Sequence, residues 1–402
     1  MTVRPPEPPD VPLTGRAGIP YAAGRVTTLT SPAELADVEA AWEALAVAAP
    51  QRLPMLAPTC LRAEWRHQLE EGETLRVHLA HSGGRLVGVL PVVERRDRLG
   101  STLLSPPRAR SGDPLLSAEA AATDLLGLLD AAFRAAPDAR GLTIAGVRDT
   151  SRTLAALRAR ALPFAVVLDE DERGSFVPVE GATLEGLRAS MSANFRRNLR
   201  KAGNRLAKEA GVAFRFETGA DASPASLDRF LALEAAGWKG REGTAIALER
   251  HTSAYYRELA EGFAARRQLE WHTLEIGGVP AAMHLGVRFG RALVLLKIAY
   301  DERFARLGPG NLLFERLLER EFEARSVAEV NCTTDMAWHR NWALPRSRYA
   351  RVTLFPRGAV PGVLGWLPTA LRARARRTGW LRRVLGKPPL DDDRAPAAGD
   401  EA

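Results

Sequence analysis

The pattern of apolar and polar positions predicts strands and helices in two successive rounds. Apolar residues that alternate with polar ones, or run unbroken over a few positions, indicate strands, and apolar residues three or four positions apart indicate helices. The first round has expected strands over residues 25–30, 75–80, 85–93, 142–145 and 164–168, and expected helices from residue 32 and over 59–70, 118–135 and 152–160. The second has expected strands over 176–179, 212–217, 268–276, 279–289, 291–299, 329–332 and 351–355, and expected helices within 184–210 and over 225–236 and 255–265.

Both rounds follow one order, in which a strand and two helices precede a meander of strands, a helix, a strand, a helix and a last strand. We therefore expect an α/β (α+β) fold in which one architecture occurs twice, with mixed, mostly antiparallel sheets flanked by helices. The expected regions are a Pro-rich disordered leader (1–24), a first domain (25–170), a second domain (175–357), and a basic amphipathic tail with a disordered end (358–402).

The stretch 291–323 carries the clearest candidate for a ligand site. Residues 292–299 form an apolar run that only Lys297 interrupts, which is typical of a buried strand. Downstream, Leu313, Leu317 and Phe322 fall on one face of a helix. The turn between them is Gly308-Pro309-Gly310. Small residues at a helix N-terminus leave backbone N–H groups and the positive end of the helix dipole facing outward, which favours a phosphate.

Two common phosphate motifs do not fit this turn. A P-loop needs Gly-Lys-Ser/Thr, and residues 310–312 read Gly-Asn-Leu. A dinucleotide fingerprint needs a third glycine at the opening of a βαβ unit, whereas this turn lies late in the chain. On the turn alone, an ordinary tight connection between a core strand and a core helix is the alternative.

The turn resembles the acyl-CoA pyrophosphate loop of the GNAT acetyltransferase superfamily, whose pattern Arg/Gln-x-x-Gly-x-Gly/Ala is met in shortened form by Arg306, Gly308 and Gly310. Three strings in the same order, EAAGWKGREGTAI, AYDERFARLGPGNLLFE and TDMAWHRNWA, are similar to the CelD/BcsL-type branch of that superfamily. The two-round arrangement also resembles that of the FemABX peptidyl transferases. The resemblance implies tandem GNAT-like domains.

The resemblance further implies acetyl-CoA or another acyl-CoA as co-substrate. Its phosphates would lie on Arg306, Leu307, Gly308, Gly310 and Asn311, and the backbone around Ile298 and Ala299 would supply the oxyanion donor. The first round has no Gly-rich loop at the corresponding place, where residues 108–113 read Arg-Ala-Arg-Ser-Gly-Asp. Only the second domain is therefore expected to bind the donor, and the first is expected to shape the acceptor side.

Acyl transfer needs a base for the acceptor, and Asp335 is the first candidate. The resemblance aligns it with the Asp of a CelD-like motif, Gly-Asp-x-x-Tyr-Lys-x-x-Trp. Trp338 then stands at the Tyr, as a substrate contact, and His339 stands at the Lys, where an imidazole offers a pKa near neutrality. The alternative for Asp335 is an N-cap of the turn that follows.

Glu234, Trp238 and Lys239 form a second cluster, at the end of the helix that walls the acceptor site in GNAT proteins. Glu234 is a further candidate base, Trp238 could stack on a sugar ring, and Lys239 could hold an anionic substituent. The alternative is a plain helix end, with Gly240 as its cap and Lys239 favourably placed on the helix dipole.

Composition and charge restrict the partners. The net charge is +8 and the basic residues are almost all arginine, with only five lysines, so we interpret the excess mainly as a compositional habit. The basic run 194–201 contains a single aromatic residue, Phe195, and is read as a solvated helix, which makes nucleic acid an unlikely partner. The two cysteines, Cys60 and Cys332, have no metal-ligand spacing, and no metal is expected.

The tail 361–387 interleaves Trp and Leu with arginines and contains no acid. An interfacial helix on anionic lipid and a helix docked on its own domain are both consistent with this pattern. Without a signal peptide or an apolar run of membrane-spanning length, the expected location is the cytoplasm, with peripheral membrane contact through 361–387 as a further option.

The expected function is an acyl-CoA-dependent N- or O-acyltransferase of GNAT type that acts on a small molecule. The CelD/BcsL resemblance suggests a sugar or polysaccharide precursor as the acceptor. Two alternatives stay open. The first is a FemABX-like transferase that uses aminoacyl-tRNA, and the second is a non-catalytic scaffold in exopolysaccharide or cellulose biosynthesis.

Overall fold

The computed structural model of the protein describes residues 25–97, 100–107, 112–158, 162–357, 365–367 and 369–370. The expected leader, 1–24, and most of the expected tail, including all of 371–402, lie outside the described residues. In the part of the tail that is described, Ala370 packs against Val167 and Phe355, while Trp366 and Leu367 are exposed. None of the helices in the described ranges is both long and apolar enough to cross a bilayer.

The first half of the chain supplies one complete round of elements. They are β1 (Val26–Leu29), η1 (Pro32–Asp37), α1 (Glu39–Ala48), η2 (Pro54–Leu56), α2 (Pro58–His67), β2 (Thr74–Ser82), β3 (Arg85–Arg96), β4 (Thr102–Ser105), β5 (Leu115–Leu116), α3 (Ala122–Ala135), β6 (Leu142–Arg148), α4 (Arg152–Leu157) and β7 (Phe164–Pro178).

The second half opens with a helix pair and then repeats the round. Its elements are α5 (Leu184–Ser190), α6 (Ala193–Leu206), β8 (Ala213–Thr218), α7 (Ser226–Ala236), α8 (Trp238–Arg241), η3 (Ile246–Leu248), α9 (Arg250–Ala265), β9 (Leu269–Ile276), β10 (Val279–Phe289), β11 (Ala292–Tyr300), η4 (Glu302–Leu307), α10 (Pro309–Ala324), β12 (Glu329–Asn331), α11 (Ala337–Asn341) and β13 (Arg346–Pro356). The repeat starts at β8, and α7 and α9 take the places of α1 and α2.

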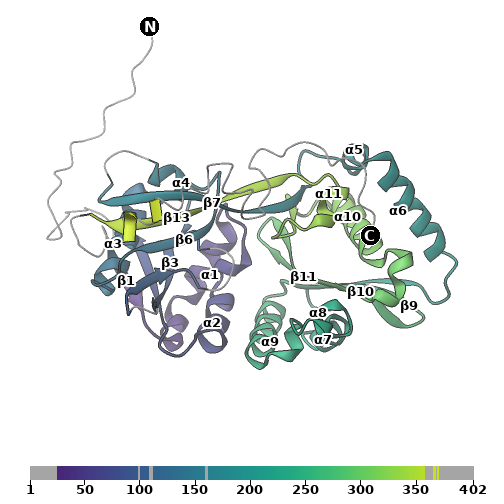
Figure 1. Cartoon of the computed structure of the whole chain (residues 1–402), viewed down its shortest axis with the longest axis horizontal. Coiled ribbons are helices and arrows are strands. Elements are labelled where there is room, and N and C mark those ends of the chain that lie inside the picture. The colour runs from purple at the N-terminus through teal and green to yellow at the C-terminus, as the bar shows by residue number, and fades with distance from the viewer. Residues whose placement is uncertain are drawn as a thin grey trace, which may run out of the picture.

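The strands of the described residues join into one mixed, mostly antiparallel sheet flanked by helices, which confirms the expected fold class. Along the sheet the order is β1-β2-β3-β4-β6-β13-β7-β12-β11-β10-β9-β8, with β5 beside β3. The final strand of the chain, β13, lies between β6 and β7 of the first half, and the end of β7 pairs with β12 of the second half. Figure 1 shows β7 and β13 running from one half to the other.

The continuous strand β7 differs from the sequence-based prediction. We expected two strands, over 164–168 and 176–179, with a domain boundary between them. Residues 169–173 read Asp-Glu-Asp-Glu-Arg, which interrupts the apolar pattern and resembles a linker. The strand continues through them because β13 pairs with it almost from end to end, from Arg346↔Ser175 to Pro356↔Phe164.

The predicted helix starts also need adjustment. The helix expected from residue 32 begins as the short 3-10 helix η1, and the hydroxyl of Ser31 donates to the Glu34 carboxylate instead of capping the backbone. The helix that was expected to be capped by Gly240 is capped by Gly237. The stretch expected within 184–210 is a helix pair, α5 and α6.

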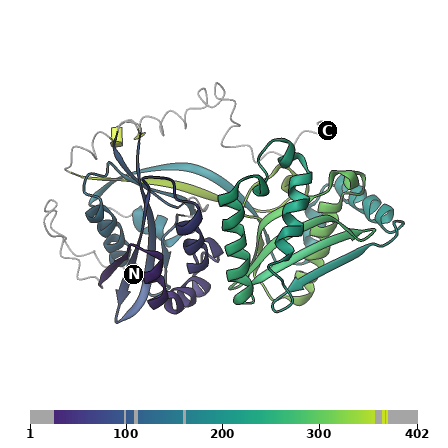
Figure 2. The same cartoon turned by 90° about the horizontal axis from the view of Figure 1, so that it is seen from below.

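The two halves share one apolar core. It contains Trp42 and Leu61 from the first half together with Phe230, Phe263 and Trp271 from the second. Across this core α2 packs against α9, and Figure 2 shows the helices of the two halves facing each other there. At the rim, the carboxylate of Glu258 on α9 accepts hydrogen bonds from Arg66 at 3.0 Å and pairs with His67 at 2.9 Å. The shared core and the contacts at its rim therefore join the two halves of the chain.

Candidate functional site

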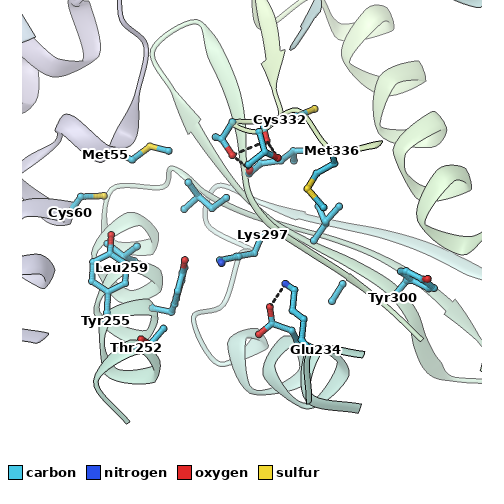
Figure 3. Close-up of a pocket in the computed structure, with 18 of the residues that line it drawn as sticks. Met55, Cys60, Glu234, Thr252, Tyr255, Leu259, Lys297, Tyr300, Cys332 and Met336 are labelled. Carbon is cyan, nitrogen blue, oxygen red and sulfur yellow. Dashed lines mark hydrogen bonds and ion pairs between the residues drawn. The ribbon is translucent and has the colours of Figure 1, made fainter. Parts of the chain in front are cut away.

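A cavity opens where β11 and β12 separate. These parallel strands pair over three positions only, from Ala292↔Glu329 to Val294↔Asn331, and β11 then runs on to Tyr300 after β12 has ended. The cavity has a volume of about 550 Å³, within the range of small-molecule sites. Figure 3 shows side chains from both halves around it. Its walls include β11 from Leu295 to Tyr300 and residues 332–334 beyond β12.

A β-bulge shapes β11 at the mouth of this cavity. Leu285 of β10 pairs with Lys297, and the next residue, Gly286, pairs with Leu295, so Leu296 is an extra residue on β11. A bulge bends a strand and re-aims the side chains that follow it. Ile298 and Ala299, which the resemblance assigned to the oxyanion contact, follow the bulge after Lys297, and both line the cavity.

The first half contributes the opposite wall, which the sequence analysis did not foresee residue by residue. Met55, Cys60, Glu64 and Gln68 line the cavity from η2, α2 and the residue after it. Glu64 is only 2% exposed, so a carboxylate from the first half lies buried at a site made mostly by the second. The cavity therefore exists only because the two halves are joined.

Glu234 occupies the floor of the cavity at the end of α7. It is 4% exposed, its Oε1 accepts a hydrogen bond from Lys239 Nζ at 2.6 Å, and its Oε2 accepts one from the Ile246 backbone N–H at 2.9 Å. Figure 3 shows this ion pair below Lys297. Both Glu234 and Lys239 line the cavity. Trp238 lies in α8, and its side chain is outside what the structure describes.

His339 lines the cavity, but both of its ring nitrogens face local backbone groups. Nδ1 accepts a hydrogen bond from the Met336 N–H at 3.1 Å, and the ring also bonds to the backbone of Thr334. Burial lowers the pKa of His339 to about 4, although the nearby Asp335 carboxylate acts in the opposite direction. The imidazole is thus neutral near pH 7, and its accepting nitrogen is occupied. Trp338 beside it lines the cavity and packs edge-on against Phe314 at 5.3 Å.

Asp335 is not among the cavity residues. Its Oδ1 accepts a hydrogen bond from the Ser175 hydroxyl at 2.9 Å and pairs with Arg346 Nε at 3.2 Å. These contacts fasten the turn after β12 to β7 and β13. The N-cap of the following helix α11 is Met336, so the alternative reading of Asp335 as that cap is wrong.

The Gly-rich turn lies at the start of α10, where the sequence analysis expected it. Gly308 adopts φ +60° and ψ +46° as the N-cap residue, a left-handed conformation that favours glycine. Gly310 follows in the first helical turn, where an added Cβ would meet nothing within 4 Å. Since N–H groups of a first turn have no carbonyl partner within their helix, the backbone of Gly310 and Asn311 can donate outward.

The surroundings of the turn hold it in place. The Arg306 carbonyl accepts a hydrogen bond from Arg205 of α6 at 2.7 Å, and Ala202 packs beside Gly308. The Asn311 side-chain oxygen accepts from Trp342 Nε1 at 2.8 Å, so Trp342 connects the end of α11 to the start of α10. Arg306, Leu307, Gly308, Gly310 and Asn311 are not cavity residues, and they form a separate surface around the N-terminus of α10.

Sequence reasoning missed several residues that line the cavity. They are Cys60, Glu64, Tyr255, Tyr256, Lys297 and Cys332. Burial raises the pKa of Tyr255 well above its usual range and that of Cys332 to about 12, so the phenol and the thiol keep their protons. The one available signal was Lys297, a charge within an apolar run. Among the described residues no group of acidic, His or Cys side chains is arranged to hold a metal ion.

Comparisons with known proteins agree with this architecture. Residues 193–339, from α6 into α11, match the model of the acetyltransferase (GNAT) domain. The crystal structure of FemX is similar at a TM-score of 0.54 and 12% identity, covering 81% of this chain and 96% of that one. A Bacteroides thetaiotaomicron protein of unknown function is similar at a TM-score of 0.51 and 12% identity, covering 82% and 100%. At these identities the likeness shows the fold alone, in which two rounds of strands and helices are joined in one sheet. No curated protein sequence matches the chain.

Proposed function

We propose that the protein is an acyl-CoA-dependent N- or O-acyltransferase whose donor binds in the second half. The observation that carries the proposal is the separation of β11 from β12, with the left-handed Gly308 turn on the same strand–helix connection. An open strand edge beside a helix N-terminus can hold an acyl carbonyl and a phosphate at the same time. The GNAT domain match over residues 193–339 supports this assignment.

In this proposal the donor is acetyl-CoA or another acyl-CoA. Its pyrophosphate lies on the backbone N–H groups of Gly310 and Asn311, with Arg306 and Leu307 beside it. The thioester reaches the separation between the strands, where a backbone N–H near Ile298 or Ala299 polarises the carbonyl. Because such a donor is fixed before the reaction, it stabilises the developing oxyanion without reorganisation.

Glu234 is the proposed general base. Of the three acid–base candidates, it is the one that lines the cavity with a carboxylate rather than a neutral imidazole. The acceptor amine or hydroxyl attacks the thioester carbon, a C–N or C–O bond forms, and the C–S bond breaks. The proton lost by the acceptor goes to Glu234, and CoA leaves as a thiolate that takes a proton from solvent. Lys239 Nζ, 2.6 Å from the carboxylate, holds Glu234 in position at the cavity.

The acceptor occupies the cavity between the halves. A volume of about 550 Å³ suits a small molecule such as a sugar or a polysaccharide precursor, with Trp338 and Lys239 as contacts. One observation favours a second donor, aminoacyl-tRNA. The exposed face of α6 carries Arg196, Arg197, Arg200 and Lys201 next to the Gly-rich turn, and the fold is similar to that of FemX.

Donor competition tests the proposal. The full chain is titrated with acetyl-CoA in a calorimeter, and then with deacylated tRNA, at two salt concentrations. We expect saturable acetyl-CoA binding that free CoA displaces, and acceptor-dependent release of thiol. Salt-sensitive tRNA binding without any CoA binding would replace acyl-CoA by aminoacyl-tRNA as the donor, and binding of neither would leave the scaffold alternative.

A further inference from the structure

Trp342 connects the Gly-rich turn to a wall of the cavity. Its indole is 1% exposed, and its Nε1 donates a hydrogen bond to the Asn311 side chain at 2.8 Å. Trp338, which lines the cavity, lies four positions earlier, on the same face of α11. Both indoles pack edge-on against Phe314 of α10, at 5.0 Å for Trp342 and 5.3 Å for Trp338, and Figure 1 shows α11 beside α10. One short helix therefore contacts both the turn and the cavity.

The partner of this indole distinguishes Trp342 from Trp42 and Trp271, which are also fully buried. Trp42 donates to the Leu56 backbone carbonyl at 2.9 Å, and Trp271 donates to the Ser223 backbone carbonyl at 2.8 Å. A backbone carbonyl is held by the chain itself, so these two bonds satisfy the indole and do little else. The partner of Trp342 is a side chain that could adopt several rotamers, so this bond also selects one orientation of the amide.

The orientation that the bond selects is suited to an anionic ligand. An indole N–H can only donate, so the amide atom that faces Trp342 is the oxygen, and the NH2 of Asn311 is turned away from the indole. Asn311 is the third residue of α10, where the backbone N–H has no carbonyl partner within the helix. The side chain and the backbone of this one residue can therefore both donate to a phosphate.

The same hydrogen bond holds the end of α11. A helix of five residues has little stability of its own, so its position depends on its contacts with the rest of the protein. Asp335, which accepts a hydrogen bond from Ser175, fastens the chain before α11, and Trp342 fastens the chain after it. Trp338 lies between these two attachments, so its place in the cavity depends on both.

Resting on the proposed function, we infer that Trp342 is a positioning residue for both substrates. It orients the Asn311 amide to donate to a phosphate of acyl-CoA. A phosphate that accepts from this NH2 restricts the amide and strengthens its bond to Trp342, because hydrogen bonds in a chain reinforce one another. Bound donor therefore holds α11, and with it the Trp338 ring, in place on the acceptor side of the cavity.

A double-mutant cycle tests the role of Trp342 in donor binding. Acetyl-CoA is titrated by calorimetry into the wild type, Trp342→Phe, Asn311→Ala and the double variant. Trp342→Phe keeps a ring against Phe314 and loses the N–H, so we expect binding roughly 3- to 10-fold weaker, and Asn311→Ala should weaken it roughly 10- to 100-fold. The double variant should bind as Asn311→Ala does, because no amide is left for the indole to orient.

Trp271→Phe is the matched control. It removes an indole hydrogen bond of the same length from a fully buried tryptophan in the same half of the chain. Its thermal unfolding should show a loss of stability similar to that of Trp342→Phe, with unchanged affinity for acetyl-CoA. A role for Trp342 in packing alone predicts the same result for both variants.

Hydrogen exchange tests whether bound donor holds α11. In the wild type, saturating acetyl-CoA should slow amide exchange over 310–314 and also over 336–344. In Trp342→Phe and in Asn311→Ala, at concentrations that restore saturation, the protection of 310–314 should remain and that of 336–344 should be lost. Both variants break the same bond, so either one alone is sufficient if the other does not fold. Trp271→Phe should keep the protection of both segments.

Three outcomes overturn the inference and leave the proposed donor in place. One is wild-type affinity for acetyl-CoA in folded Trp342→Phe, and another is a loss in the double variant equal to the sum of the two single losses. The third is a wild type in which acetyl-CoA protects 310–314 alone, or variants in which 336–344 stays protected. If the wild type does not bind acetyl-CoA at all, the proposed function has failed and the inference falls with it.

Discussion

The two halves of the chain differ in what fills the space beside their central strand. In the second half β11 continues to Tyr300 and leaves an open separation from β12. In the first half the equivalent strand, β4, has four residues, and the chain returns into the corresponding space. There the Gly112 N–H donates to the Ala145 carbonyl of β6 at 2.8 Å, and β5 pairs with β3.

This difference shows how one architecture can serve two purposes. In the first half, Gly112 sits so close to Pro106 that an added Cβ would lie 2.4 Å from the Pro106 Cβ. The backbone itself therefore occupies the place that a donor is proposed to take in the second half. Instead, the first half contributes α2, whose buried Glu64 lines the cavity made by β11. The fold is repeated, and the site is not.

The largest expected effect is a loss of turnover when a carboxylate inside the cavity, rather than one outside it, is replaced. Glu234→Gln should lower turnover by roughly 10²–10⁴, the range of a general base, with acetyl-CoA affinity nearly unchanged. The side-chain oxygen of Gln can still accept the hydrogen bond from the Ile246 N–H, so the variant can retain this contact. Asp335→Asn is the contrast, because Asp335 holds Ser175 and Arg346 outside the cavity. It should cost stability and change turnover by less than the Glu234 variant, as measured by steady-state kinetics and urea unfolding.

A smaller loss in turnover for Glu234→Gln than for Asp335→Asn would contradict the placement of the base in the cavity. The base would then have to act from the turn after β12, as the sequence alone suggested.

The next largest expected effect is a loss of CoA affinity when the Gly-rich turn of the second half is changed. Gly310→Val should weaken CoA binding roughly 10- to 100-fold, the equivalent of the 1–3 kcal/mol that steric overcrowding costs. Nothing in the protein lies within 4 Å of the new Cβ, so any clash is with a ligand. Calorimetry with CoA measures the loss, and thermal unfolding should show a stable fold. Unchanged CoA affinity in the folded variant would remove this turn from the donor site.

The matching change in the first half should lower stability and leave CoA affinity unchanged. Gly112→Ala places its methyl group 2.4 Å from Pro106 Cβ and 3.3 Å from the Ala145 nitrogen. We expect a loss of about 1–3 kcal/mol in unfolding free energy, typical of overpacking, with CoA affinity unchanged. Urea titration and calorimetry measure the two quantities. A loss of CoA affinity without a loss of stability would mean that the first half binds a donor after all.

The smallest effect is a pH dependence present in both halves. Burial lowers the pKa of His78 in the first half, and of His339 in the second, to about 4 from the usual 6.5. Between these values the unfolded chain binds more protons than the folded one. Each histidine therefore contributes stability that is complete above about pH 6.5 and is lost as the pH falls toward 4.

Urea unfolding from pH 4.5 to 7.5 measures this dependence. His78→Gln and His339→Gln should each flatten the slope, and the pH–rate profile of His339→Gln should keep the acidic limb of the wild type. A slope that is identical in all three proteins would show that neither imidazole is held neutral.

The sequence predicted the elements well and the contacts between distant segments poorly. Periodicity located the strands from 268 to 299, and the glycines located the turn before α10, because both signals are local. From the sequence we predicted two strands in place of β7, because the charged residues 169–173 interrupt the apolar pattern. These residues are nevertheless part of one strand, since β13 pairs along it. Asp335 was favoured from a motif, but Ser175, its hydrogen-bonding partner, is 160 positions away in the chain.

The cavity itself was beyond a reading of local patterns. Glu64 and Tyr255 belong to helices whose apolar faces read as ordinary core, and they meet only when the halves pack together. The bulge at Leu296 has no sequence signature here, so the direction of Lys297 could not be predicted. The lysine was visible as an interruption of an apolar strand, but the side of the sheet that it faces depends on a one-residue shift in register.

The stoichiometry of acetyl-CoA binding distinguishes an open second half from a closed first half. We would titrate the full chain with acetyl-CoA by calorimetry and repeat the titration with Gly310→Val and Gly112→Ala. We expect one site per chain in the wild type, weakened by Gly310→Val and preserved in folded Gly112→Ala. Two sites per chain, or a single site that responds to Gly112 and not to Gly310, would contradict the division between an open second half and a closed first half.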